Sequence, residues 1–401
     1  MGLTIRSADE NALLVARQNR KGPLVARSEF RSDLRRQQHR DKRGLARFVD
    51  LKAELKRRLV KPFVASHMNP MPKKLAALLF AVTAIVSIRT APVFAQEGLC
   101  SAPVAAEGAV LKDYRPIFQR CANEAGAKRL AIRSMKANGA ALLFMVDPES
   151  LSTRIERAEC WRCADASDAE ESGTRFIAAL RKPAGDTIPK VLENAGLIHG
   201  EGGGSFLTGD LCPSRKPLDR GFFEALEPRT PIALAVSGLW IQRHGPDWEW
   251  LKRKAESGAL AISWVNHSFR HPYVRGRPDG QTYLLTPGVD IGREILETEK
   301  LMISGGATPS AFFRFPGLVS DEALMEKLRE RHLIVLGSDS WLALGPPPRP
   351  GSIVLVHPNG NEEAGLKIFN RLVAQGKMPK PFRPIVEAPA KNDIFTQTKM
   401  P

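Results

Sequence analysis

The second half of this 401-residue sequence alternates short, almost continuously apolar runs with longer amphipathic stretches, and this alternation constrains the fold more than any other feature. The apolar runs have the length of strands and lack the apolar-polar alternation of a half-exposed sheet, so they predict parallel strands buried on both faces. We expect strands at residues 205–208, 232–236, 260–265, 311–315, 333–337, 352–356 and 382–387. The stretches between them predict helices at residues 218–226, 246–256, 289–303, 321–331 and 361–375.

Seven strands that alternate with helices predict an α/β fold, either an α/β barrel or a doubly wound sheet. Both folds place their chemistry at the carboxyl ends of the strands. Residues 100–200 are less regular: residues 140–146 indicate a strand, residues 172–180 indicate a helix, and the glycines at 202–204 indicate a hinge. We therefore expect a small accessory region before the main α/β domain.

The formal net charge of +16 is concentrated at the N-terminus. Residues 1–74 contain 19 Lys and Arg against 7 Asp and Glu, whereas the 306 residues after Ala95 carry only +3. The charge therefore does not require a globular surface that binds a polyanion. With 43% hydrophobic and 25% charged residues, the composition also disfavours global disorder and a polytopic membrane protein.

Residues 68–95 have the organisation of a secretory signal peptide. Lysines at 73 and 74 supply positive charge, residues 75–88 are almost purely apolar, and Val93 and Ala95 provide a small-x-small cleavage site. The apolar stretch is short for a bilayer span, which needs about 20 residues, so cleavage after Ala95 is expected over an uncleaved anchor.

About 70 Arg-rich residues without a periodic apolar core precede this segment, although a signal peptide lies near the start of its chain. We therefore expect translation to start at Met68 or Met71. The competing interpretation is a basic arm that binds nucleic acid or anionic lipid. The predicted organisation is a basic extension, a signal peptide, an accessory region, the main domain and a tail, at residues 1–67, 68–95, 96–202, 203–388 and 389–401.

All five cysteines follow the proposed cleavage site, which suits an oxidising compartment where one or two disulfides form and one thiol is left over. They are Cys100, Cys121, Cys160, Cys163 and Cys212. The spacing of Cys160 and Cys163 also occurs in redox motifs and in half of a zinc site, but no second CxxC pair accompanies it. We therefore expect a structural disulfide or two inert thiols there.

Polar residues lie at or just after the predicted strand ends, and three of the six histidines that follow the cleavage site are among them. Because the carboxyl ends of parallel strands meet at one edge of a sheet, we expect these side chains to share one site. They are, in chain order, Asp210, His267, His271, Arg314, Asp339, Trp341 and His357.

His267 and His271 have the HxxxH spacing that places two imidazoles on one side of a helix in zinc proteases, but Ser268 replaces the glutamate base of those enzymes. Pro272 disfavours helical geometry at His271, so we expect a turn at a strand end. Two neutral imidazoles and a carboxylate form a three-ligand metal site with room for water or substrate. Taken alone such a pair is more often packing or surface histidine, and its position beside the other polar strand ends favours the metal site.

These segments, in this order, resemble the polysaccharide deacetylases of carbohydrate esterase family 4, the NodB-homology domain. That family has a T-F-D-D-G-P strand end, a metal-binding histidine pair, an R-x-P segment, a D-W segment and an L-x-H segment. The corresponding segments are Thr208-Gly-Asp-Leu-Cys-Pro213, His267-Ser-Phe-Arg-His271, Arg314-Phe-Pro-Gly317, Asp339-Ser-Trp341 and Leu355-Val-His357. The resemblance covers residues 203–388 and implies a distorted (β/α) barrel of the polysaccharide deacetylase type.

The resemblance implies a divalent metal as cofactor, with zinc expected first and cobalt or manganese as alternatives. Its ligands would be Asp210, His267 and His271, and Arg314 would orient an acidic base, for which Asp210 stands at the matching position. The metal would polarise the amide carbonyl and lower the pKa of a bound water towards about 7, while a carboxylate takes the proton.

The resemblance also implies a general acid and a substrate-binding pocket. His357 would protonate the leaving amine, and Asp339 would tune it. Pro316, Trp341 and Leu355 would bind the substrate, with Trp341 and Leu355 as walls around the acetyl methyl group.

The first motif departs from the family pattern. Aligning Thr208 and Pro213 with the ends of T-F-D-D-G-P leaves Asp210 at the base position and Leu211 where a metal-binding aspartate is expected. Either Asp210 serves the metal and another group is the base, or two histidines and water hold the metal weakly, or catalysis is lost. Cys212 is close enough to become a soft ligand, although a small buried residue is its more common role.

We therefore predict an exported, metal-dependent hydrolase, periplasmic or secreted, that removes N-acetyl groups from an amino-sugar polymer or oligosaccharide. Nucleic acid is not an expected partner, and no stable membrane span is expected after signal removal. The alternative, motivated by Leu211, is a non-catalytic glycan-binding or envelope-assembly protein on the same fold.

Overall fold

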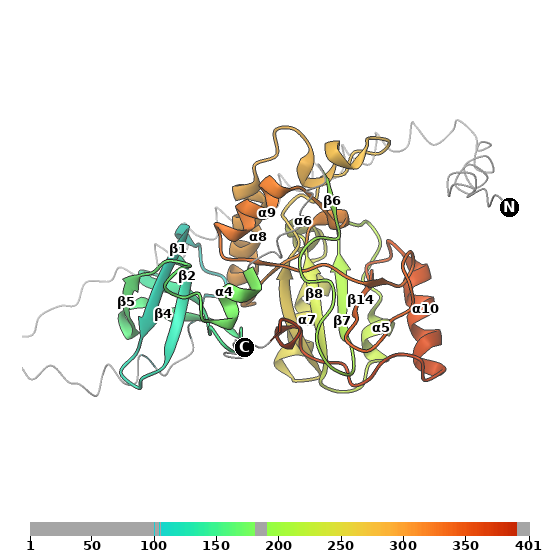
Figure 1. Ribbon diagram of the computed structural model, residues 1–401, viewed down its shortest axis with the longest axis horizontal. Coiled ribbons are helices and arrows are strands. Elements are labelled where there is room, and N and C mark those ends of the chain that lie inside the picture. The colour runs from blue at the N-terminus through green and yellow to red at the C-terminus, as the bar shows by residue number, and fades with distance from the viewer. Residues whose placement is uncertain (1–99, 101–103, 105, 181–190, 391–401) are drawn as a thin grey trace, which may run out of the picture. The chain divides into compact units, whose positions relative to one another are not determined.

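The computed structural model describes Cys100, Val104 and residues 106–180 and 191–390 (Figure 1). The basic extension, the signal peptide and nearly all of the tail lie outside the described residues, so the predictions about them stay predictions. Within the described part of the chain, no helix combines the length and the apolar character that crossing a bilayer requires.

The described chain begins with a five-stranded antiparallel sheet of order β4-β3-β2-β1-β5. Asn138 and Gly139 form the tight turn between β2 and β3, and both have positive φ, as a two-residue hairpin turn requires. The predicted strand at residues 140–146 is confirmed as β3, whereas the predicted helix at 172–180 begins later, as α4 (Arg175–Leu180). The strands are β1 (Lys112–Ala122), β2 (Lys128–Ala137), β3 (Ala140–Val146), β4 (Thr153–Arg157) and β5 (Arg162–Asp165).

Two disulfides belong to this region. Cys121 pairs with Cys163 across β1 and β5, and Cys100 pairs with Cys160, which leaves Cys212 as the free thiol. The prediction of one or two disulfides and one remaining thiol is confirmed. Because Cys160 and Cys163 have different partners, their CxxC segment forms neither a redox pair nor half of a zinc site.

Seven parallel strands form the second sheet, in the order β12-β10-β9-β8-β7-β14-β13. This is the order of a barrel that is open between its fifth and sixth strands, β12 and β13, so the predicted α/β fold with a distorted barrel is confirmed. The strands are β7 (Phe206–Leu211), β8 (Thr230–Val236), β9 (Leu260–Asn266), β10 (Pro309–Phe313), β12 (Ile334–Val335), β13 (Ser340–Trp341) and β14 (Ile353–Val356).

Helices connect these strands, and four of them begin with an aspartate or serine whose side chain accepts a backbone N–H. These caps are Asp219, Ser237, Asp290 and Asp321. The helices are α5 (Arg220–Glu224), α6 (Gly238–Arg243), α7 (Gly245–Glu256), α8 (Ile291–Ser304), α9 (Glu322–Arg329) and α10 (Glu363–Ala374). Short elements complete the described part of the chain: β6 (Leu192–Glu193), β11 (Val319–Ser320) and the 3-10 turns Ala158–Cys160, Asp279–Gln281, Tyr283–Leu285, Pro316–Leu318 and Ile385–Glu387.

Successive residues of the parallel strands face two different cores, as the period of two requires. In β8, Ala233 and Ala235 belong to an inner core that also contains residues of the antiparallel sheet. Ile232, Leu234 and Val236 belong instead to an outer core under α5, α6, α7 and α10. The parallel strands are thus covered on both faces, which explains their continuous apolar sequence.

The same alternation orients β7. Phe206 belongs to the inner core, and Leu207 and Leu211 belong to the outer core. Thr208 and Asp210 therefore share the face of Phe206 and point to the interior of the curled sheet. The side chains of Thr208 and Asp210 therefore point towards the carboxyl ends of the neighbouring parallel strands.

A buried ion pair joins the antiparallel sheet to α8. Arg133 is fully buried and donates from Nε and Nη2 to the two carboxylate oxygens of Glu299, at 2.8 and 2.9 Å. The hydroxyl of Tyr114 donates to the same carboxylate at 2.9 Å, and Nη1 of Arg133 donates to the carbonyl of Arg331 at 2.7 Å. Because a buried charge is costly unless all its partners are present, this satisfied network fixes β2 against α8.

One strand prediction is wrong. Residues 382–387 contain a single bridge, between Phe382 and Ser205, followed by the 3-10 turn Ile385–Glu387. Pro381 and Pro384 lack the N–H groups that a ladder needs, which explains why this apolar run does not become a full strand.

Candidate active site

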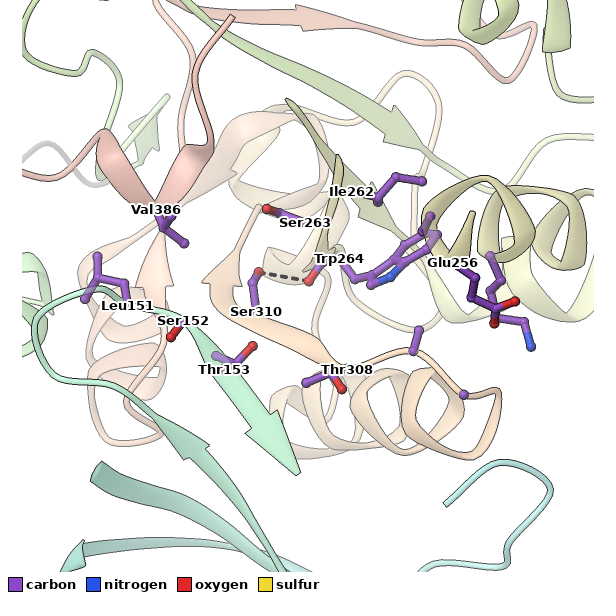
Figure 2. A pocket seen from close by; sticks show the side chains of 14 residues that line it. Leu151, Ser152, Thr153, Glu256, Ile262, Ser263, Trp264, Thr308, Ser310 and Val386 are labelled. Atoms are coloured by element: carbon purple, nitrogen blue, oxygen red, sulfur yellow. Dashed lines mark hydrogen bonds between the residues drawn. The ribbon is translucent and has the colours of Figure 1, made fainter. Parts of the chain in front are cut away.

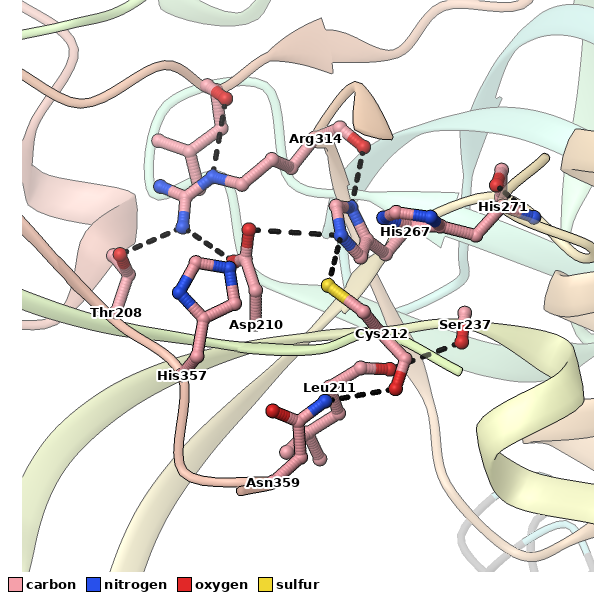
Figure 3. Close-up of polar contacts among 12 residues, drawn as sticks. Thr208, Asp210, Leu211, Cys212, Ser237, His267, His271, Arg314, His357 and Asn359 are labelled. Atoms are coloured by element: carbon pink, nitrogen blue, oxygen red, sulfur yellow. Dashed lines mark hydrogen bonds and ion pairs between the residues drawn. The ribbon is translucent and has the colours of Figure 1, made fainter. Parts of the chain in front are cut away.

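The carboxyl ends of β7, β9, β10 and β14 bring four of the predicted residues together (Figure 3). Asp210 is the next-to-last residue of strand β7, His267 follows β9, Arg314 follows β10 and His357 follows β14. All four side chains are buried. The expectation that strand-end residues share one site is therefore met by these four.

Arg314 holds Asp210 in place. Its Nη1 donates to Asp210 Oδ1 at 2.8 Å and to Thr208 Oγ1 at 2.7 Å. The remaining donors bind backbone carbonyls beyond β12, with Nη2 to Gly337 at 2.9 Å and Nε to Leu336 at 3.3 Å. These four contacts fix the guanidinium of Arg314. It binds only Oδ1 of Asp210, so Oδ2 is left without a contact to Arg314.

His267 presents one ring nitrogen to the site. Its Nδ1 lies 2.9 Å from the backbone carbonyl of Arg314, so Nδ1 carries the proton and donates. Nε2 then faces Cys212 Sγ at 3.5 Å and Asp210 Oδ2 at 3.6 Å. Burial lowers the pKa of His267, but the Asp210 carboxylate and Cys212 outweigh burial and raise the pKa above its usual value.

The segment from His267 to His271 is a turn, as predicted, and not a helix. Ser268 and His271 both have positive φ, at 64° and 50°. Asn266 accepts the backbone N–H of Ser268 at 3.0 Å, and Glu294 from α8 accepts the N–H groups of residues 269 and 270 at 2.9 and 2.7 Å. Asn266 and Glu294, which sequence reasoning missed, thereby shape the turn that directs His271 towards His267.

Three potential metal ligands converge here. In the described part of the chain, the ligand atoms of Cys212, His267 and His271 all lie within 4.8 Å of one another. His271 Nε2 is buried and has no hydrogen-bond partner. Burial raises the pKa of the Cys212 thiol, but the surrounding imidazoles outweigh burial and hold the pKa well below its usual range. The predicted ligand set, which had Asp210 in place of Cys212, therefore differs from the group that the structure assembles.

His357 is paired with a carboxylate that the sequence analysis did not identify. Its Nδ1 lies 3.0 Å from Oε2 of Glu362, which also accepts the indole N–H of Trp341 at 2.7 Å. Burial lowers the pKa of His357, but Cys212 and Glu362 outweigh burial and raise the pKa to about 10. In the sequence, the short separation of five residues between His357 and Glu362 is the one feature that could have suggested this pair.

Asp339 does not occupy the predicted position beside His357. It contacts Nδ1 of His199 at 2.8 Å and accepts the Ser352 hydroxyl at 3.1 Å and the Ile353 N–H at 2.9 Å. Ile353 is the first residue of β14, whereas His357 follows its last residue, so the two groups lie at opposite ends of one strand. The prediction that Asp339 tunes His357 is wrong for this geometrical reason.

Asp210, Cys212, His271 and His357 line a pocket of about 320 Å³. Trp341 and Leu355 contribute to its wall as predicted, but Pro316 does not. Gly317, the next residue, lines the pocket instead and has a φ of 62°; a Cβ there would meet the Tyr283 ring at 2.4 Å. The lining residues are Asp210, Cys212, Pro213, His271, Tyr273, Tyr283, Gly317, Leu318, Trp341, Leu355, His357, Asn361 and Glu362.

A larger pocket, of about 460 Å³, lies by the β3–β4 turn, α7 and β9 (Figure 2). Ser310 bridges β10 and β9 in its wall by donating to the Trp264 carbonyl at 2.8 Å. Its ionisable residues are Lys252 and Glu256, and Lys252 is already paired with Glu107 and Glu249. This pocket is lined by no histidine or cysteine, so the chemistry-bearing site is the smaller one.

One family model and several solved structures are similar to part of this chain. A family model described as the RP012 protein N-terminal domain matches residues 112–173, which contain the antiparallel sheet. A family 4 carbohydrate esterase of Bacillus anthracis is 21% identical, covering 49% of this chain and 87% of its own, with a TM-score of 0.34. The family 4 carbohydrate esterase PdaA of Bacillus subtilis is 18% identical, covering 48% and 84%, with a TM-score of 0.35. A family 4 pseudoenzyme of Bacillus anthracis is 16% identical, covering 50% and 70%, with a TM-score of 0.33. At such values the geometry of the pocket must carry the functional argument.

Proposed function

We propose that this protein is a metal-dependent hydrolase that removes N-acetyl groups from an amino-sugar polymer or oligosaccharide. One observation carries the proposal: a single pocket contains a carboxylate fixed by arginine, a group of metal-ligand atoms and a histidine paired with a carboxylate. Amide hydrolysis needs a base, an electrophile for the carbonyl and an acid for the leaving amine. Asp210 would serve as the base and His357 as the acid. The electrophile would be a metal held by His267 and His271.

The donors present fit a divalent metal. His271 Nε2 is a buried nitrogen without a hydrogen-bond partner, and the lone pair of His267 Nε2 faces the same space. These two nitrogens and a third donor from the end of β7 would hold the ion. A divalent metal bound there would polarise the amide carbonyl and acidify a water.

Asp210 is the proposed base. Its Oδ1 is occupied by Arg314, so Oδ2 is the oxygen left to accept a proton from the attacking water. Arg314 itself is immobilised by Thr208 and two backbone carbonyls, so the carboxylate does not need to reorganise during the reaction. Arg314 is thus a positioning residue for the base.

His357 is the proposed acid. Despite burial, the contacts with Cys212 and Glu362 raise the pKa of His357 to about 10, which favours the protonated imidazole that an acid requires. Glu362 engages Nδ1, which leaves the proton on Nε2 for the departing amine. Trp341 fixes the same carboxylate oxygen of Glu362 and also lines the pocket, so it links the acid to the apolar wall proposed for the acetyl methyl group.

The proposed location is outside the cytoplasm, in the periplasm or secreted. Two disulfides form among the described residues, and disulfides persist in oxidising compartments. The signal peptide expected at residues 68–95 agrees with this location.

The test is acetate release from acetylated chito-oligosaccharides by the zinc-loaded protein and by two variants. Asp210→Asn removes the base and keeps the size of the side chain, so release should fall by about 100-fold or more. Asp165→Asn makes the same change on an exposed residue of β5 and should leave release unchanged. Loss of release from a folded Asp210→Asn supports the proposal, whereas no release from the folded wild type with any divalent metal favours the glycan-binding alternative.

A further inference from the structure

Two residues at the end of β7, Asp210 and Cys212, compete to be the third metal donor beside His267 and His271. They are two positions apart and reach the same pocket. Which of them takes this role decides whether the site is an oxygen site or a sulfur site. The choice between these two donors matters only if the site binds a metal, so the inference rests on the metal-dependent function proposed above.

The contacts of Asp210 engage it elsewhere. Its Oδ1 belongs to the buried pair with Arg314 at 2.8 Å, and its Oδ2 is 3.6 Å from His267 Nε2. A shift of this carboxylate towards His271 would break the buried ion pair and leave an uncompensated charge, which is strongly destabilising. Asp210 is also outside the group of ligand atoms that includes His271.

Cys212 has the opposite character. It is the chain's one free cysteine, since the other four of the five form disulfides. Its Sγ lies 3.5 Å from His267 Nε2 and within 4.8 Å of the ligand nitrogens of both histidines. His271 Nε2, buried and without a partner, is an independent sign that this space is built for a ligand.

The backbone around Cys212 is fixed so that its side chain faces the histidines. The buried Asn359 donates to the Cys212 carbonyl at 2.8 Å, and the Ser237 hydroxyl donates to the Leu211 carbonyl at 3.0 Å (Figure 3). Leu211, fully buried, packs in the outer core on the other face of β7. The leucine that replaces the expected aspartate therefore never faces the metal site, and the residue after it does.

We propose that the thiolate of Cys212 completes a Cys-His-His metal site with His267 and His271, and that this site selects zinc over magnesium, calcium and manganese. Thiolate and imidazole ligands favour zinc, whereas those other ions prefer oxygen donors. Three protein ligands also leave the fourth position of a tetrahedral zinc open for substrate or water. Asp210 is thereby left to act as the base.

The test is spectroscopic and uses the full chain loaded with cobalt(II). Because the other four cysteines are in disulfides, a near-ultraviolet sulfur-to-cobalt charge-transfer band can arise only from Cys212. We expect the band in the wild type and in Asp210→Asn, and its loss in Cys212→Ser. Zinc affinity should fall by more than about 10-fold in Cys212→Ser, since even partners outside the ligand set contribute about 10- to 100-fold.

X-ray absorption of the zinc-loaded wild type provides a measurement that needs no variant. We expect one sulfur at about 2.3 Å and nitrogens at about 2.0–2.1 Å from the metal. A first shell of nitrogen and oxygen alone, or a charge-transfer band that survives in Cys212→Ser, would overturn the ligand assignment.

The ligand assignment and the proposed function fail in different ways. If a sulfur ligand is found but no acetate is released, the Cys-His-His assignment stands and the proposed deacetylase function is rejected. If the zinc-loaded protein releases acetate but no sulfur ligand is found, the proposed function stands and the Cys-His-His assignment is rejected. Cys212→Asp should abolish the band and shift the preference of the site towards manganese, because a carboxylate replaces the thiolate.

Discussion

Glu362 Oε2 lies 3.0 Å from His357 Nδ1, in the wall of the pocket that Cys212 and His271 also line. The same oxygen accepts the indole N–H of Trp341 at 2.7 Å. This pairing orients the ring and favours the protonated imidazole. Three residues that the sequence separates by up to 21 positions are thus joined around the proposed acid, His357.

Glu362→Gln should weaken the proposed acid. Glu362 is one of the groups that raise the pKa of His357 to about 10, so its loss lowers this pKa. An acid must be protonated to act, and activity therefore falls as the pH rises through its pKa. We expect the basic limb of the kcat profile to move to lower pH in the variant. The measurement is the pH dependence of acetate release by the metal-loaded protein.

Glu363→Gln is the matched control. Glu363 is the next residue, is exposed, and contacts Lys216 and Lys367 at 3.4 and 3.8 Å, both outside the pocket. Its variant should keep the wild-type profile. Equal shifts in both variants would contradict the pairing of Glu362 with His357.

Arg314→Met should destabilise the fold as well as stop catalysis. Arg314 and Asp210 are fully or almost fully buried, and removing the guanidinium leaves a buried carboxylate without its partner. We expect the free energy of unfolding to fall by about 3–5 kcal/mol in urea denaturation. Arg270→Met, at an exposed site, should change it by less than about 0.5 kcal/mol. A loss of similar size in both variants would count against the buried pair.

Leu211→Asp tests the position of the missing aspartate. The change introduces the residue that the deacetylase motif resembled by this segment has there, but the Leu211 side chain is fully buried in the outer core. A carboxylate without a partner in that core should cost several kcal/mol of stability, so we expect a lower unfolding midpoint and no tighter metal binding. A stable variant with increased zinc affinity would show that position 211 reaches the metal site.

The disulfide between Cys121 and Cys163 should stabilise the antiparallel sheet. It joins β1 to β5, the edge strand, which shares only four paired positions with β1. Replacing both cysteines by serine should lower the free energy of unfolding by about 2–5 kcal/mol. Denaturation followed by a probe in this sheet measures the loss, and an unchanged midpoint would contradict it.

The parallel sheet was predictable because its signals are local. Strands covered on both faces are continuously apolar, as the run from Ile232 to Val236 shows. Polar residues such as Asp210 and His267 stand out directly after such runs. The antiparallel sheet lacked this contrast, since β1 is largely exposed or partly exposed and contains four charged residues. Only β3, with five consecutive buried residues, resembled a strand in the sequence.

The site was predictable where a residue's role depends on its strand end, and not where it depends on contacts across the fold. Glu294 supports the histidine turn from α8, and no spacing in the sequence links them. Asp339 was misplaced because the sequence does not show at which end of β14 it lies. Cys212 was noted as a neighbour of the motif, but its approach to His267 and His271 depends on the fixed end of β7.

A metal titration is the decisive test of whether hydrolysis by this protein depends on a metal in the pocket. The purified protein is stripped with a chelator, titrated with zinc and assayed for acetate release from acetylated chito-oligosaccharides. We predict no release without metal and a rise that saturates near about one zinc per chain. Undiminished release by the stripped protein, or no release from a folded protein with zinc bound, would contradict the claim.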